Sequence, residues 1–299
     1  MENFNLLVQN VSGFVWNKVL ILLLIGTGIF FTVVLKFIQV RKFGEGYKRA
    51  VKGVNLNGES AGADGMSSFQ SLATAIAAQV GTGNLAGAAT AIASGGPGAI
   101  FWMWISAFFG MATVYAEAVL GQLYKQRVDG EIVGGPAYYI SEGLGKNRFS
   151  KGLAIFFALS CVLALSFMGN AVQANSIASA FSNVLSIKPI YIGIPIAIVS
   201  GFIFWGGTQR IASFTEKVVP IMAGLYVGAS ILIILFNFSQ VIPAFKMIIT
   251  GAFNPSAVLG GATGITIKEA VRFGVARGLF SNEAGMGSTP HAHAVAKVD

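Results

Sequence analysis

Gln79-Val80-Gly81-Thr82-Gly83-Asn84 lies in the middle of a segment that otherwise has the composition of a membrane-spanning helix. A helix in hydrocarbon keeps its backbone hydrogen bonds because no water is there to replace them. Glycine weakens a helix by about 1 kcal/mol relative to alanine, and polar side chains add a desolvation cost. The stretch therefore predicts a helix that is interrupted for a purpose, with free N–H and C=O groups facing a cavity or a ligand.

The composition is that of an integral membrane protein. Of the 299 residues, 54% are hydrophobic and 11% are charged, and the mean hydropathy is +0.70, whereas an average globular protein has about 25% charged residues. The net charge of +8 arises mainly from basic residues in loops between apolar segments. That pattern is the positive-inside signature, so it requires no nucleic-acid partner. The single cysteine, Cys161, excludes a disulfide framework.

Apolar runs predict about seven transmembrane helices, since a span needs about 20 mostly apolar residues. The basic residues that follow the first run, from Lys36 to Lys52, place its end in the cytoplasm and the N-terminus outside. We expect an all-α, polytopic membrane helix bundle in the plasma (inner) membrane, with a cytoplasmic linker at 40–65 and an outer interfacial helix at 243–253. The predicted spans are residues 16–37, 67–92, 99–123, 152–184, 190–205, 218–238 and 266–294.

A second interruption is predicted in the seventh span, within residues 278–287. Gly285-Met286-Gly287-Ser288 shares a Gly-x-Gly-polar pattern with Gly81-Thr82-Gly83-Asn84. The two spans are predicted to run in opposite directions across the membrane. Opposed, interrupted helices are typical of an inverted repeat that has its binding site where the breaks meet. The alternative for these glycines is a face of small residues on which helices pack closely.

Three segments, residues 79–87, 134–140 and 278–288, resemble signature sequences of the alanine or glycine:cation symporter family, which are sodium-coupled carriers of prokaryotes. The resemblance runs along essentially the whole chain and implies a LeuT-type fold. Residues 1–299 would form a single transmembrane domain. It would contain an extra N-terminal helix (16–37), a first five-helix repeat (67–238) and the first helix of a second repeat (266–294). Family members continue through four further core helices. We therefore expect a fragment or a truncated product that does not transport as it stands.

An amino-acid site needs donors for a carboxylate and acceptors for an ammonium group. The N–H groups of Thr82 and Gly83 would face the carboxylate at the start of a half-helix, and Gln79 could accept from the ammonium. The expected substrate-binding residues are Gln79, Gly81, Thr82, Gly83, Phe273, Gly274, Ser281 and Asn282. Sodium, a hard cation, takes oxygen ligands. The LeuT-type pattern implies that the carbonyls of Ala77 and Val80 and the side chain of Asn84 bind it.

These expectations point to sodium-coupled symport of small neutral amino acids, alanine or glycine, by alternating access. Sodium is co-transported and is not a prosthetic group, and membrane lipid is the remaining partner. A proton-coupled carrier that uses Glu117 or Glu283 stays open, as does a passive channel for small solutes. The sequence contains no nucleophile–base motif, so we do not expect an enzyme.

Several polar residues within the spans have two interpretations. Glu117 could take part in coupling, or could reach water or pair with a base near the cytoplasmic end of its span. Arg277 and Glu283 could pair with each other or with Glu117, and hold the broken helix in place. Asn170 and Gln173 could face the site or form hydrogen bonds between helices.

Overall fold

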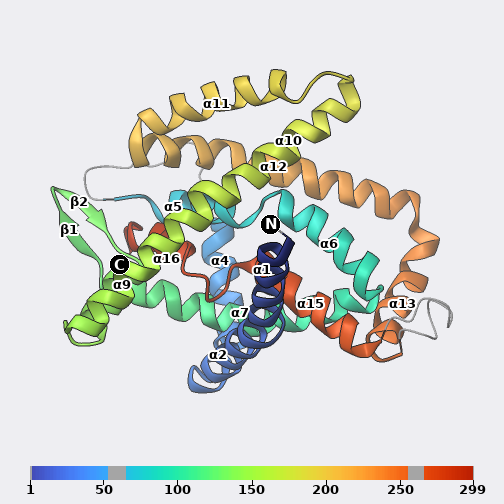
Figure 1. Cartoon of the computed structure of the whole chain (residues 1–299), viewed down its shortest axis with the longest axis horizontal. Helices are drawn as coiled ribbons and strands as arrows, with labels where there is room; N and C mark the ends of the chain where they lie inside the picture. Colours follow the sequence, from blue (N-terminus) through green and yellow to red (C-terminus); the bar gives the residue numbers. More distant parts are fainter. Residues whose placement is uncertain (1, 53–64, 255–265, 299) are drawn as a thin grey trace. The chain divides into compact units, whose positions relative to one another are not determined.

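The computed structural model describes residues 2–52, 65–254 and 266–298, and this part of the chain is mostly helical (Figure 1). The all-α prediction is confirmed apart from one antiparallel hairpin, β1 (Gln126–Val128) and β2 (Glu131–Val133). Its turn residues, Asp129 and Gly130, have φ angles of 51° and 85°. Positive φ at both positions is the geometry that Asp-Gly favours in a two-residue hairpin turn.

Four helical runs within the described residues are long and apolar enough to cross a membrane. They are Asn3–Val34, Gly98–Leu123, Arg148–Leu185 and Gly207–Phe236. The predicted span at 190–205 forms α11 (Ile190–Trp205), whose 16 residues fall short of the roughly 20 that a crossing needs. The predicted spans at 67–92 and 266–294 are each divided into two helices. This arrangement is consistent with a multi-pass membrane protein.

Two helices extend further than hydropathy indicates. The first begins at Glu2 and not near Trp16, and runs without a gap through α1 (Glu2–Phe14), the π-helical turn η1 (Val15–Leu20) and α2 (Ile21–Val34). The sixth predicted span, 218–238, belongs to α12, which already begins at Gly207 and ends at Phe236. Hydropathy detects only the apolar part of a helix, whereas helical hydrogen bonding continues into the polar residues beside it.

The predicted linker at 40–65 is helical in its first part. It holds α3 (Ile38–Arg41) and α4 (Phe43–Lys52), and its residues 53–64 lie outside the described part of the chain. The predicted interfacial helix corresponds to α13 (Val241–Phe253), which follows a short 3-10 turn, η3 (Phe238–Gln240).

One compact unit comprises Met1–Gly44, Asn84–Ala116 and Val227–Met286. Within it, α7 (Gly98–Leu123) and α15 (Ile267–Asn282) pack closely through glycines. A Cβ atom added at Gly274 would lie 2.3 Å from the carbonyl oxygen of Ala99, and one added at Gly278 would lie 2.0 Å from Oγ of Ser106. Small residues allow this approach between membrane helices.

A second compact unit comprises Glu45–Gly83, Glu117–Tyr226 and Gly287–Asp299. Here α5 (Ser68–Gln79) packs on α16 (Thr289–Ala294), and Oγ of Ser71 donates to the carbonyl oxygen of Ala292 at 2.9 Å. The flanking segments pair as well. Met66 N–H donates to the Val295 carbonyl at 3.0 Å, and Lys297 N–H donates to the Met66 carbonyl at 2.8 Å.

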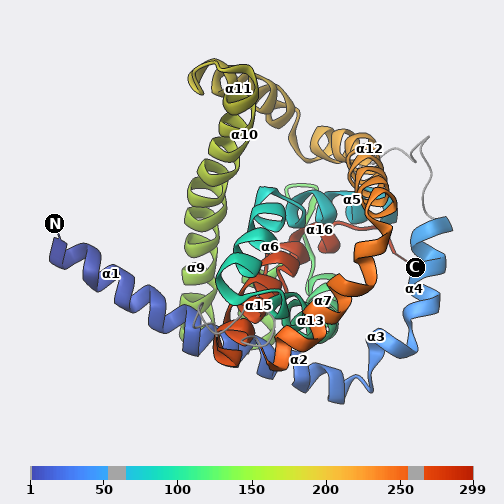
Figure 2. The ribbon, with the colours of Figure 1, turned by 90° about the vertical axis from the view of Figure 1, so that its right-hand side faces the viewer.

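The rest of the second unit contains the short helix α8 (Pro136–Gly143) and a long continuous helix. This long helix consists of α9 (Arg148–Cys161), the π-helical turn η2 (Val162–Gly169) and α10 (Asn170–Leu185). Figure 2 shows it along its length. It corresponds to the predicted span at 152–184. Its main consequence for function is that it places Gln173 opposite the first interrupted helix.

Candidate functional site

The predicted interruption near residue 80 is confirmed. α5 ends at Gln79, Val80 adopts an extended conformation (φ −93°, ψ 95°), and α6 (Thr82–Gly95) begins two residues later. Val80 N–H still donates to the carbonyl of Ile76 at 2.8 Å, so the helical ladder ends there. A break of this kind frees the last carbonyls of one helix and the first N–H groups of the next. Ala77 and Gln79 lie at the first of these ends, and Thr82 and Gly83 lie at the second.

The start of α6 holds an oxygen atom supplied by another helix. Both the backbone N–H and the hydroxyl group of Thr82 donate to Oε1 of Gln173, at 3.0 Å and 2.6 Å. Gly81 makes this approach possible, because a Cβ atom there would lie 2.1 Å from Nε2 of Gln173. Of the two interpretations of Gln173, the structure shows the interhelical hydrogen bond, and it lies at the break itself. Asn170, the other polar residue considered, is exposed.

The second predicted interruption is confirmed, and it lies in the later part of the predicted range of residues 278–287. α15 starts with a capping box formed by Thr266 and Glu269, and continues as helix through Gly278 and Ser281 to Asn282. The break therefore covers Glu283 to Ser288, and α16 follows. Three residues of the break, Glu283, Gly285 and Gly287, have positive φ angles of 52°, 78° and 76°. Residues 278–281 remain helical, and Gly278 allows α15 to pack closely on Ser106 of α7.

Two side-chain oxygens satisfy backbone N–H groups in this second break. Oδ1 of Asn282 accepts from Ala284 N–H at 3.1 Å, and Oε1 of Glu117 accepts from Gly287 N–H at 3.1 Å. Glu117 is 7% exposed. Burial and the neighbouring Glu117 carboxylate raise the pKa of Tyr139, on α8. Glu117 therefore holds the broken segment in place through its hydrogen bond with Gly287 N–H.

The predicted residues of α15 have different surroundings. Gly274 is buried against Ala99 and Trp102 of α7. Phe273 lies beside Gly95, with the guanidinium group of Arg272 5.1 Å from the centre of its ring. Ser281 and Asn282 form the last turn of α15. Arg277 lies next to Gly87, and its pairing with Glu283 or Glu117 stays a prediction.

The predicted site residues are divided between the two compact units. Ala77, Gln79, Val80, Gly81, Thr82 and Gly83 belong to one unit, and Asn84, Phe273, Gly274, Ser281 and Asn282 belong to the other. Their convergence on a common substrate and sodium site stays a prediction.

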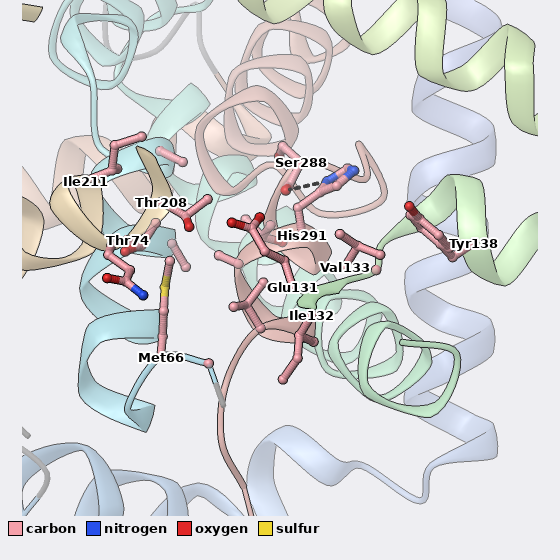
Figure 3. Close-up of a pocket in the computed structure, with 18 of the residues that line it drawn as sticks. Met66, Thr74, Glu131, Ile132, Val133, Tyr138, Thr208, Ile211, Ser288 and His291 are labelled. Atoms are coloured by element: carbon pink, nitrogen blue, oxygen red, sulfur yellow. Dashed lines mark hydrogen bonds between the residues drawn. The ribbon is translucent and has the colours of Figure 1, made fainter. Parts of the chain in front are cut away.

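A cavity of about 720 Å³ lies within the second unit. Its lining includes Thr74, Ala75 and Ala78 of α5, Thr208 and Ile211 of α12, residues 129–133 of the hairpin turn and β2, and Ser288, Thr289, His291 and Ala292 around the start of α16. In Figure 3, Thr74, Thr208 and Ile211 lie on one side of this cavity, Val133 and Tyr138 lie on the other, and Glu131 and His291 lie between them. The cavity thus borders α5, which precedes the first break, and α16, which follows the second break.

The sequence profile described as the sodium:alanine symporter family matches residues 1–299. The chain belongs to the sodium:alanine symporter family. The family consists of transporters and not of enzymes, and the resemblance noted in the sequence is thereby confirmed.

Two relatives are similar to this chain over nearly its full length. The sodium/alanine symporter AgcS of Methanococcus maripaludis is 44% identical over 298 residues, which are 99% of this chain and 64% of that protein. The amino-acid carrier protein AlsT of Bacillus subtilis is 41% identical over 299 residues, which are 100% of this chain and 61% of that protein. The chain thus spans somewhat less than two thirds of the length of these relatives.

Sequence reasoning on this symporter-family chain missed two buried polar residues, Gln70 on α5 and Glu216 on α12. Nε2 of Gln70 donates to Oε2 of Glu216 at 2.9 Å. A signal was present, since Glu216 is an acid four residues after Ala212 and three before Val219, and both of these are buried on the same helix face. The predicted start of the span at residue 218 left Glu216 in a loop.

Proposed function

We propose that the protein carries out sodium-coupled symport of small neutral amino acids, alanine or glycine, across the plasma membrane. Membership in the sodium:alanine symporter family supports the transport class. The observation that carries the proposal is the oxygen-binding arrangement at the start of α6, where two donors of Thr82 converge on one oxygen atom. A helix N-terminus with converging donors suits a carboxylate, because the helix dipole and the free N–H groups both favour negative charge.

In this proposal the substrate carboxylate takes the place of Oε1 of Gln173. The amide oxygen is a neutral acceptor, whereas a carboxylate forms charge-assisted hydrogen bonds that are roughly twice as strong. The substrate therefore displaces Gln173 from Thr82 and also binds Gly83. Gln173 fills the donor site while no substrate is bound, so that Thr82 N–H is not left unsatisfied in a low-dielectric environment.

The remaining substrate contacts come from both interrupted helices. Gln79 and the carbonyls freed at the end of α5 accept from the ammonium group, and the lack of a side chain at Gly81 lets the substrate approach the backbone. Ser281 and Asn282 supply polar contacts from the last turn of α15. Phe273 covers a small side chain and limits substrate size, and Gly274 beside it lets α15 pack closely on α7.

Sodium is proposed to bind next to the substrate. Its ligands are the carbonyl oxygens of Ala77 and Val80 and the side-chain oxygen of Asn84, a set of oxygen donors that suits a hard cation. The proposed fold is the LeuT-type inverted repeat. In this fold the zwitterionic substrate and the sodium ion bind near the bilayer midplane, where the two breaks meet. The cavity beside α5 and α16 then forms part of the route to the cytoplasm, with the N-terminus outside.

Uptake of labelled alanine and glycine into proteoliposomes that contain the complete gene product tests this function. An inward sodium gradient is expected to drive saturable accumulation, and collapse of the gradient is expected to abolish it. Uptake that ignores the sodium gradient would overturn the coupling, and flux that never saturates would indicate a passive channel.

The variant Asn84→Ala tests the sodium assignment. Loss of one oxygen ligand is expected to raise the sodium concentration for half-maximal uptake about tenfold, which corresponds to about 1.4 kcal/mol, while the ratio of alanine to glycine uptake stays unchanged. The matched control is Asn170→Ala, since Asn170 is exposed on α10 and its loss is expected to leave both quantities unaltered. A change in substrate preference alone would show that Asn84 is not a sodium ligand.

A further inference from the structure

The segment that follows the first membrane-spanning run ends in a short basic helix, α4 (Phe43–Lys52). Residues 36–52 contain six basic side chains and a single acid, Glu45. The basic residues that the structure shows to be exposed are Lys36, Arg41, Lys42, Lys48 and Arg49. A cluster of this size directly beside a membrane helix attracts the negative surface of anionic lipids.

The apolar and basic residues of α4 are segregated on two faces. Phe43 and Tyr47 are four positions apart and therefore share one face, and 67% and 63% of their surfaces are exposed. Lys48 and Arg49 lie on the opposite face, because each residue turns the helix by about 100°, and both are exposed. A helix with aromatic residues on one face and Lys or Arg on the other is typical of one that lies in the membrane interface.

A defined turn separates α3 from the membrane helix α2. Lys36 and Phe37 have consecutive left-handed φ angles of 53° and 54°, a conformation that ends a helix. Phe37 N–H donates to the carbonyl oxygen of Thr32 at 2.7 Å, and Nε2 of Gln39 donates to Oγ1 of Thr32 at 3.1 Å. Ile38, the first residue of α3, is 7% exposed. The departure of the chain from the membrane helix is therefore built into the fold.

The connection between α2 and α4 is short enough to keep α4 near the lipid surface. Residues 35–42 separate the two helices, and eight residues span at most about 28 Å even when fully extended. Part of this connection is the helix α3, which is more compact than an extended chain. A tethered helix meets the headgroups at a high effective concentration, so individually weak contacts are sufficient for binding.

The acid on α4 leaves its polar face positive. Nη2 of Arg49 lies 3.1 Å from Oε1 of Glu45, and the two side chains are 80% and 46% exposed. An exposed pair of this kind is weak. The guanidinium group has five N–H donors in a planar fork, so Arg49 can bind a phosphate group while it remains beside Glu45.

We propose that α4 is an interfacial helix that binds anionic lipid headgroups. Phe43 and Tyr47 insert at the boundary between headgroups and acyl chains, and Lys48 and Arg49 lie at the level of the lipid phosphates. A zwitterionic surface offers the same apolar contact without the net negative charge, so α4 binds an anionic surface more strongly. This binding requires neither amino acid nor sodium, and it does not rest on the proposed function.

The test places a fluorescent reporter on α4 in the complete gene product, reconstituted into lipid vesicles. Native cysteines, including Cys161, are replaced by Ala. Gly46→Cys is then labelled with an NBD group, since a Cβ atom at Gly46 meets nothing within 4 Å. Quenching by a lipid with a nitroxide near the top of its acyl chain measures how close α4 lies to the bilayer.

Quenching is expected to depend on lipid charge and on salt. Phosphatidylcholine vesicles that contain about one third phosphatidylglycerol are expected to give about threefold more quenching than phosphatidylcholine alone. The difference is expected to disappear at about 1 M salt, where the Debye length is about 3 Å. Equal quenching in the two kinds of vesicle at low salt would overturn the proposal.

Paired charge substitutions locate the effect on α4. Lys48→Gln combined with Arg49→Gln is expected to remove most of the threefold difference. The matched control, Arg148→Gln combined with Lys151→Gln, removes two exposed charges from α9 and is expected to retain it. Phe43→Ser weakens the apolar contact and is expected to lower quenching about twofold in both kinds of vesicle.

The variants also define the results that contradict lipid binding by α4. A difference that survives the loss of both Lys48 and Arg49 would reject the proposal. If the control pair on α9 removed the difference to the same extent, the lipid charge would act on the protein as a whole and the proposal would also fail. Absence of quenching in both kinds of vesicle would mean that protein covers α4. Sodium-driven alanine uptake is measured separately, and its failure would reject the symport proposal without changing the result for α4.

Discussion

The two helix breaks share a Gly-x-Gly-polar sequence but differ in construction. The first is short, with Val80 and Gly81 between α5 and α6, and its first N–H donor is satisfied by Gln173 from a separate helix. The second runs from Glu283 to Ser288, contains three positive φ angles and is held by Asn282 and Glu117. Glycine serves the close approach of a side chain in the first break and the backbone conformation in the second.

The sharpest test of this difference is a matched pair of glycine substitutions. Gly287→Ala is expected to lower the free energy of unfolding by about 3 kcal/mol, because a left-handed φ strains a non-glycine residue and the added Cβ atom overpacks the site. That atom would lie 2.6 Å from Phe157 and 2.7 Å from Pro136. Gly81→Ala displaces only the end of the flexible Gln173 side chain and is expected to cost about 1 kcal/mol. Denaturation of the purified variants in detergent measures both, and equal losses would contradict the distinction.

The next largest effect is expected at Glu117. Glu117→Ala removes the acceptor of Gly287 N–H and leaves a buried donor unsatisfied, which costs about 2 kcal/mol of stability. Glu117→Gln retains a carbonyl oxygen and is expected to lose less than half of that. Unfolding midpoints of the two variants provide the measurement. If Glu117→Gln abolished uptake and left the midpoint unchanged, Glu117 would act in coupling and not in support of the break.

Gln173 is expected to affect substrate binding with a sign that depends on the substitution. Gln173→Leu removes the internal competitor for Thr82, so the apparent affinity for alanine rises up to about fivefold, equivalent to about 1 kcal/mol. Gln173→Glu places a charged acceptor at the start of α6 and lowers the affinity by a similar factor. Concentration dependence of initial uptake rates gives both values. A loss of affinity in both variants would mean that Gln173 binds the substrate directly.

The smallest effect on stability is expected at Asn282. Its Oδ1 accepts from Ala284 N–H, whereas its Nδ2 is buried without a partner in the described part of the chain. Asn282→Ala loses one favourable bond and removes one unsatisfied donor, so the net change is expected to be below about 0.5 kcal/mol. The Michaelis constant for alanine is nevertheless expected to rise, because Asn282 belongs to the proposed substrate site. An unchanged Michaelis constant would remove Asn282 from that site.

The sequence predicted features that depend on local chemistry. Glycine and polar residues in an apolar run indicated the first break, because a continuous membrane helix excludes that combination. The second break was located only within the broader range of residues 278–287, because a small residue in a membrane helix can mark either a break or a packing contact. Gly278 packs against Ser106, which only the neighbouring helix reveals. The hairpin had a local signal in Asp129-Gly130 that hydropathy does not register.

Contacts between distant residues were beyond sequence reasoning. Gln173 and Asn170 were equivalent candidates on the same helix until the structure placed Gln173 against Thr82. Gln70 and Glu216 are 146 positions apart, and no pattern in either segment relates one to the other. The polar residues of the membrane helices were therefore predictable as a class, whereas their pairing was not.

The backbone hydrogen bonds of Met66 with Val295 and Lys297 restrict how the half-helices move. They tether the start of α5 to the end of α16, so we expect the two helices to move together as one rigid body. Spin labels on α5 and α16 are therefore expected to keep a constant separation whenever either helix moves. Release of either half-helix on its own would first require this short parallel bridge to separate.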